Sequence, residues 1–141
     1  MSSRLPDDPD DIHRVVLDTN VFVAAAFNPR SDAARIVDAV REGRLRLVWS
    51  EGTRRETRRV LEQIPPISWT PFADLFRDEM RYRGKLNPAW FGQVRDPADR
   101  KFGALAYAAA ATLITQDDDL LRVRSNGAVP ILTPAEFLGR R

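Results

Sequence analysis

The chain has 141 residues, no cysteine and a formal net charge of +2 at pH 7. Its length, with 43% hydrophobic and 30% charged residues, predicts one globular domain, and the lack of cysteine excludes disulfides, zinc–thiolate sites and thiol nucleophiles. Twenty arginines stand against two lysines, which favours phosphate recognition, although a genomic bias toward arginine codons gives the same count. No apolar run reaches the length of a membrane span and the N-terminus lacks the pattern of a signal peptide, so we expect no membrane association and a cytoplasmic protein.

The first predicted strand places an acid at its end. Residues 1–11 are polar and acidic, which predicts a disordered tail before a domain over 12–141. Val15–Leu17 is a short β-branched apolar run and predicts a buried strand of a parallel sheet. Asp18 ends this run, and Asn20 is placed to cap the helix that follows. Asp18 therefore lies where open α/β sheets bind ligands, or else it only helps to cap that helix.

Helix and strand patterns alternate along the rest of the chain. In order, the sequence predicts a helix over 31–43, a strand over 45–49, a helix over 50–63, a helix over 71–83, a helix over 96–111, a strand over 112–115, a helical turn over 117–121, a strand over 129–132 and a helix from 133. Phe72 and Phe76 share one face of the 71–83 helix, and we interpret them as core or dimer contacts rather than a base-stacking platform. The alternation predicts a three-layer α/β fold with a mainly parallel sheet.

Four acids fall near the ends of predicted strands or at the starts of the helices after them: Asp18, Glu56, Asp99 and Asp117. Each also has a structural interpretation, such as an ion pair between Glu56 and Arg59 or a favourable charge at a helix start for Asp99. Clustered carboxylates need compensation, and oxygen ligands without cysteine favour Mg²⁺ or Mn²⁺ over zinc. Such a site is suited to attack of water on a phosphodiester.

Four motifs carry a family resemblance: Val16-Leu-Asp-Thr-Asn20, Ser50 with Glu56, Asp96-Pro-Ala-Asp-Arg-Lys-Phe102 and Leu113-Ile-Thr-Gln-Asp117. In order and spacing they resemble the motifs of PIN-domain proteins, and most of all the small stand-alone VapC-like toxins. The resemblance extends over about residues 12–138. It implies a three-layer α/β/α fold with about five strands, Mg²⁺- or Mn²⁺-dependent endoribonuclease activity on single-stranded RNA, an antitoxin partner encoded nearby and a homodimer.

The resemblance also implies the roles of individual residues. The catalytic and metal-binding acids would be Asp18, Glu56, Asp99 and Asp117. Asn20 and Thr115 match positions that commonly support the metal ligands through hydrogen bonds. Gln116 stands where close relatives often have glycine, Asp96 could share the site with Asp99, and Asp119 competes with Asp117 as the fourth acid. None of these departures removes an acid, so we expect an active enzyme.

The predicted 50–63 helix carries four arginines beside Glu56. Like charges four residues apart weaken a helix, a cost that phosphates of a bound nucleic acid would offset; a solvated face bridged by Glu51 and Glu62 is the alternative. We predict a basic rim around the acids that binds single-stranded or structured RNA. The candidate RNA-binding residues are Arg55, Arg59, Arg100 and Lys101.

Two other functions compete with the ribonuclease hypothesis. A PIN-like RNA-binding or regulatory module with little turnover would bind RNA without a divalent metal. A phosphotransfer domain would use Asp18 as its nucleophile. One such pattern, that of haloacid-dehalogenase-like phosphatases, requires a second acid two residues after the nucleophile, where this chain has Asn20.

Overall fold

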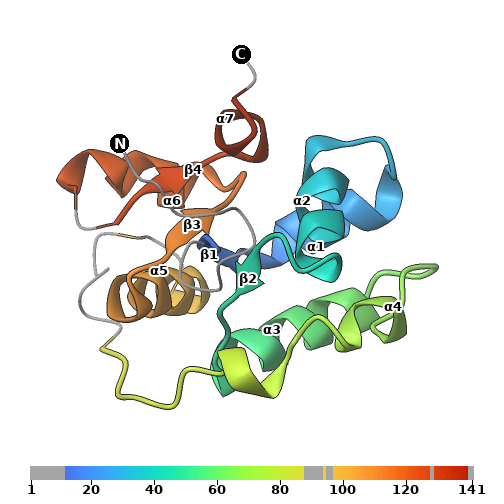
Figure 1. The fold of residues 1–141 in the computed structure, drawn as a ribbon, viewed down its shortest axis with the longest axis horizontal. Helices are drawn as coiled ribbons and strands as arrows, with labels where there is room; N and C mark the ends of the chain where they lie inside the picture. Colours follow the sequence, from blue (N-terminus) through green and yellow to red (C-terminus); the bar gives the residue numbers. More distant parts are fainter. Residues whose placement is uncertain (1–11, 88–93, 95–96, 128, 140–141) are drawn as a thin grey trace.

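The computed structural model describes residues 12–87, 94, 97–127 and 129–139, so the expected tail over 1–11 and Asp96 lie outside it. The described chain forms a parallel sheet in the order β2-β1-β3-β4 (Figure 1). Its strands are β1 Arg14–Leu17, β2 Arg46–Leu47, β3 Thr112–Ile114 and β4 Ile131–Leu132. The predicted α/β fold with a parallel sheet is confirmed, with four strands in the described residues rather than about five.

Helices cover both faces of the sheet, and Figure 1 shows α5 across the strands from α1 and α2. The helices are α1 Thr19–Phe27, α2 Asp32–Arg41, α3 Glu51–Glu62, α4 Thr70–Ala73, η2 Asp78–Met80, α5 Pro97–Ala109, α6 Asp118–Arg122, η4 Val123–Asn126 and α7 Pro134–Phe137. Successive strand residues point to opposite faces, so Val15 and Leu17 join the core under α1 to α4, whereas Val16 joins the core under α5 and α6. This alternation produces the three layers.

Three of the predicted helices begin with a serine or threonine whose side chain caps the first turn. Ser31 accepts a hydrogen bond from the Ala34 backbone N–H at 3.1 Å. Ser50 caps α3 in a reciprocal capping box, and Thr133 caps α7 in the same way. Because these signals involve only residues three positions apart, they can be recognised without tertiary information.

The expected cap of the first helix is wrong by two positions. Helix α1 begins at Thr19, so Asp18 occupies the N-cap position with φ −61° and ψ 149°, and its side chain makes no capping hydrogen bond. Asn20 is already inside the first turn and is exposed. The reason is that β1 leads directly into the helix, which leaves no turn between them. The edge strands are also shorter than the predicted 45–49 and 129–132.

The predicted helix over 71–83 is wrong, because α4 ends at Ala73 and only the short η2 follows. Hydrogen bonds to Trp49, which is distant in sequence, hold this segment in a non-helical path. The indole N–H of Trp49 donates to the Arg77 carbonyl at 2.7 Å, and its own carbonyl accepts from the Tyr82 N–H at 2.7 Å. The core interpretation of the aromatic residues is confirmed: Phe72 is 7% exposed, and Phe76 packs against Phe22 and two tryptophans.

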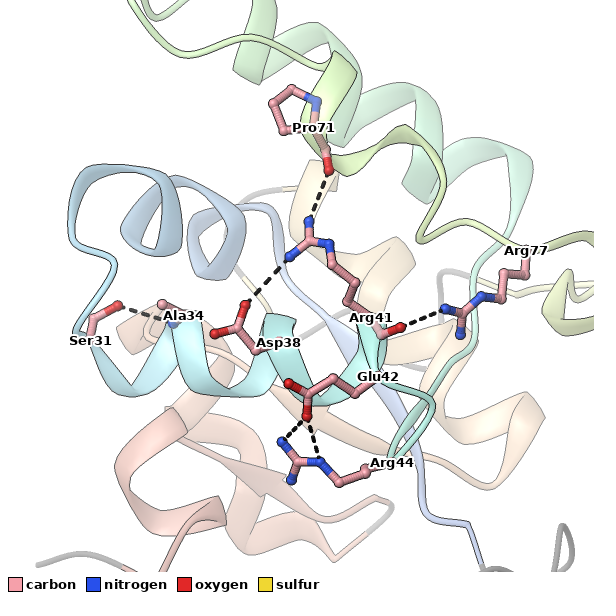
Figure 2. Close-up of polar contacts among 8 residues, drawn as sticks. All are labelled: Ser31, Ala34, Asp38, Arg41, Glu42, Arg44, Pro71 and Arg77. Atoms are coloured by element: carbon pink, nitrogen blue, oxygen red, sulfur yellow. Dashed lines mark hydrogen bonds and ion pairs between the residues drawn. The ribbon is translucent and has the colours of Figure 1, made fainter.

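Two arginines fasten this segment to α2 (Figure 2). Arg77 donates from its guanidinium to the Val40 carbonyl at 3.1 Å. It also donates to the Arg41 carbonyl at 3.1 Å, the contact drawn in Figure 2, at the C-terminal end of α2. Arg41 in turn donates to the Pro71 carbonyl at 2.9 Å and reaches Asp38 at 3.4 Å. Cations satisfy the last carbonyls of a helix and complement its dipole. The contacts therefore cap α2 and position the irregular chain after α4.

Candidate active site at the carboxyl edge of the sheet

Asp18 is fixed where β1 and β3 end side by side. Its backbone N–H donates to the Ile114 carbonyl at 3.1 Å, which continues the pairing of the two strands. The Thr115 hydroxyl donates to Asp18 Oδ2 at 2.7 Å. Asp18 is only 2% exposed and Thr115 is fully buried. Thr115 therefore orients the Asp18 carboxylate through a direct hydrogen bond, and its predicted role in supporting a metal ligand stays a prediction.

Burial raises the pKa of the Asp18 carboxyl from 3.8 to about 6. The hydrogen bond from Thr115 lowers this pKa, the negative charge of Asp117 raises it, and the backbone N–H groups of Thr19 and Asn20 lower it. Among the described residues, no basic side chain forms an ion pair with Asp18. A buried carboxylate beside a second carboxylate is costly unless a cation neutralises the two.

Asp117 shares the same threonine. Its backbone N–H donates to the Thr115 hydroxyl oxygen at 2.9 Å, and its carboxylate accepts from the Asp119 N–H at 2.8 Å as the N-cap of α6. Asp119 forms an ion pair with Arg122 at 3.4 Å. The Thr115 hydroxyl therefore links the two strand-end acids, since it donates to Asp18 and accepts from Asp117.

Glu56 projects from α3 with a side chain only 16% exposed. The ion pair with Arg59 that the sequence allowed is confirmed, at 2.8 Å, and Lys101 of α5 approaches the other oxygen at 3.8 Å. Beside it, the buried hydroxyls of Thr19 and Thr57 lie 3.0 Å apart and join the start of α1 to α3. Sequence reasoning missed this pair, although the buried positions of α3 at intervals of four, Thr53, Thr57 and Leu61, carry the signal.

Asp99 is the third residue of α5, partly buried, and has interactions of its own. Asp96 lies outside the described residues. Within the described ranges, no three His, Cys, Asp or Glu side chains form a group that could hold a metal. The structure thus brings Asp18 and Asp117 together, and the four-acid site stays a prediction. The donor chemistry of the pair, oxygen only and without a basic partner among the described residues, fits Mg²⁺ or Mn²⁺.

The arginines of α3 are engaged with neighbouring side chains. Arg55 lies 3.8 Å from Glu51, and Arg58 lies 3.4 Å from Glu62, so the alternative of a bridged, solvated face describes these contacts. Arg54 packs over the rings of Trp49 and Trp69. At the start of α5, the remaining candidates are also engaged, because Arg100 donates to the Val94 carbonyl at 2.8 Å and Lys101 pairs with Glu56. RNA binding by these residues stays a prediction.

Comparison with known proteins identifies the family. The model of the PIN domain matches residues 14–119, a range that contains all four predicted acids. The uncharacterised protein MJ1680 of Methanocaldococcus jannaschii is 27% identical over 145 residues, which cover 89% of each chain. In the part of the chain that the structure describes, no helix is long and apolar enough to cross a membrane.

Two solved structures share the fold. FitAcB from Neisseria gonorrhoeae superposes with a TM-score of 0.55 at 19% identity, over 85% of this chain and 97% of that chain. FitAB bound to an IR36 DNA fragment gives a TM-score of 0.54 at 18% identity, over 85% and 94% of the two chains. The family match covers most of the sequence, and the fold agrees with it. This chain therefore belongs to the PIN-domain family.

Proposed function

We propose that this protein is a metal-dependent ribonuclease that hydrolyses phosphodiester bonds of single-stranded RNA. The observation that carries the proposal is the buried Asp18 carboxylate beside Asp117, a pair that has no basic partner among the described residues. Membership of the PIN-domain family supports it, since PIN domains are generally nucleases. A strongly perturbed carboxyl at the carboxyl edge of a parallel sheet is also typical of a functional site.

The proposed ligands of Mg²⁺ or Mn²⁺ are Asp18, Glu56, Asp99 and Asp117. A bound divalent cation supplies Lewis acidity and neutralises charge at the phosphate. Thr115 holds the Asp18 carboxylate in one orientation, which keeps an oxygen directed toward the ligand position. The chain offers no cysteine nucleophile, so we assign the attacking group to water. Lys101, held by Glu56, places a positive charge where phosphate oxygens would approach.

We further infer that the protein is the toxin of a toxin–antitoxin pair, acting in the cytoplasm as a homodimer with an antitoxin encoded nearby. The resemblance of its motifs to VapC-like toxins supports this assignment. The fold shared with FitAB, a protein whose structure was solved on a DNA fragment, is consistent with it. We expect a partner gene beside this one, whose product blocks cleavage when the two are co-expressed.

Cleavage of an end-labelled single-stranded RNA tests the proposal. We expect cleavage with Mg²⁺ or Mn²⁺ but not with EDTA, and its loss in Asp18→Asn and Asp99→Asn. Asp74→Asn is the matched control, because Asp74 is exposed and lies beyond α4. Wild-type protein that binds RNA yet cuts nothing with either metal would refute the nuclease assignment.

One observation favours a second candidate, the RNA-binding module with little turnover. The described residues bring only two of the four acids together, and no group of three that could hold a metal is found among them. On this reading, RNA affinity would persist in EDTA and in Asp18→Asn, with no cleavage by any variant. The same cleavage and binding assays therefore separate the two functions.

A further inference from the structure

A basic groove lies at the amino edge of the sheet, at the opposite end of β1 from Asp18. It has a volume of about 890 Å³ and lies between the starts of β1 and β2, residues 79–82 and the C-terminal end of α5. Three arginines line this amino-edge groove, Arg14, Arg46 and Arg81, and Glu79 is the acid among its described lining residues. At about 3.3 Å per strand residue, Arg14 lies about 13 Å from Asp18.

Arg14 and Arg46 are direct neighbours across the sheet. They are Cα partners in the parallel pairing of β1 with β2, and both side chains line the groove. Neighbouring strands lie only about 4.8 Å apart, and like charges directly opposite each other destabilise a sheet. Neither arginine forms an ion pair with another described residue. Glu79 lines the same groove but forms no ion pair with either arginine in the described chain, and a bound anion would offset the repulsion between them.

Arg46 also has a hydrogen-bond donor without an acceptor. Its Nε is buried and has no partner among the described residues, and its Nη1 reaches only the Met80 sulfur, at 3.7 Å. A thioether is a weak acceptor, so the terminal amino groups of this guanidinium make no strong hydrogen bond within the described chain, while its Nε stays buried. Phosphate oxygens match a guanidinium in geometry and charge.

Arg81 also lines the groove, in a fixed position and with its charge offset by an ion pair. Its guanidinium lies 5.6 Å from the centre of the Trp49 ring and 3.2 Å from a Glu51 oxygen. Tyr82, the next residue, also lines the groove and provides an aromatic side chain. Tyr82 is partly buried against the core, so the arginines of the groove would hold a single strand through its phosphates rather than through stacked bases.

We propose that the amino-edge groove binds backbone phosphates of the single-stranded RNA, as a second contact site away from the acids; the inference rests on the proposed function. A volume near the upper end of the usual range for ligand sites, about 300–1,000 Å³, exceeds what one phosphate fills. Helix α5 connects the two sites, since Ala109 lines the groove and Asp99 lies ten residues earlier. At 1.5 Å per residue this separation is about 15 Å, or about four nucleotide steps of a stacked strand.

Fluorescence anisotropy tests this site with the full chain, a fluorescein-labelled single-stranded RNA of about twelve nucleotides, and EDTA to prevent cleavage. Two lost phosphate contacts lower the slope of log affinity against log salt by about 1.4 for single strands. We expect that decrease, and about tenfold weaker binding at low salt, in Arg14→Gln/Arg46→Gln. Arg35→Gln is the matched control, because Arg35 is exposed on α2 outside the groove. Arg46→Lys, which keeps the charge, should retain the slope.

An unchanged salt slope in the folded double variant would overturn the proposal, as would groove-dependent binding of an oligo-aspartate peptide by a protein that does not bind RNA. If the double variant does not fold, Arg14→Gln alone decides the matter, since Arg14 is exposed and its loss should lower the slope by about 0.7. If RNA binds through the groove but is never cut with Mg²⁺ or Mn²⁺, the nuclease function is refuted and RNA binding by the groove stands. If the wild type cuts RNA but the double variant keeps the wild-type salt slope, the nuclease function stands and RNA binding by the groove is refuted.

Discussion

Asp18 should make the protein less stable as the pH rises, and replacing it with asparagine should remove that loss. Burial raises the pKa of Asp18 from 3.8 to about 6, and each factor of ten in a proton equilibrium corresponds to about 1.4 kcal/mol. Ionised Asp18 therefore lowers the free energy of unfolding by about 3 kcal/mol. Asparagine is nearly the same size and can still accept the hydrogen bond from Thr115.

The sign follows from proton linkage. Below pH 3.8 the carboxyl is protonated in the folded and the unfolded chain, so it adds no penalty. Between pH 3.8 and about 6 the unfolded chain loses the proton first, and the stability of the wild type falls relative to that of Asp18→Asn. Above this window the variant should be more stable by about 1–3 kcal/mol, with the lower value allowing for imperfect accommodation of the amide.

Urea denaturation of both proteins from pH 4 to 8, in EDTA, measures this difference directly. Taking the difference between the two proteins cancels the titration of all other carboxyls they share. A second series with Mg²⁺ or Mn²⁺ should stabilise the wild type and leave Asp18→Asn unchanged, because a ligand stabilises only the state that binds it. A difference between the proteins that stays constant with pH, or grows in favour of the wild type, would refute the reasoning.

Two further predictions concern helix ends. Ala110 has φ +53° just after α5, which costs an L-residue about 1–2 kcal/mol, so Ala110→Gly should raise the free energy of unfolding by about 0.5–1 kcal/mol; a lower urea midpoint would contradict this. Arg77→Ala removes both guanidinium contacts to the last carbonyls of α2 and should cost about 1–2 kcal/mol, and an unchanged thermal midpoint would show that water replaces them without loss.

Local signals predicted much of the fold because their causes are local. The caps at Ser31, Ser50 and Thr133 depend on groups three residues apart, and the strand at Val15–Leu17 on a short apolar run. The helix predicted over 71–83 failed because hydrogen bonds to Trp49 stabilise a different backbone path there. The residues of that segment alone do not indicate that Trp49 will form hydrogen bonds with it.

The candidate site shows the same division. The rule that parallel strands end at one edge of a sheet predicted that Asp18 and Asp117 lie near each other, because each follows a strand. The hydroxyl pair of Thr19 and Thr57 depends on how α3 packs on α1, and sequence periodicity does not specify that packing. Arg14 and Arg46 face each other because of the register between β1 and β2. The sequence alone does not specify that register.

The shortness of the outer strands limits how this sheet can associate with other chains. Within the described chain, β2 and β4 form the two edges and contain two residues each, and the Trp49–Arg81 bridge occupies the backbone just beyond β2. Exposed edges with unpaired N–H and C=O groups are the templates for strand addition and aggregation. Because the edge strands offer few unpaired backbone groups, another chain has little to pair with, which protects the protein from edge-to-edge aggregation. The expected homodimer would therefore have to form through helical surfaces.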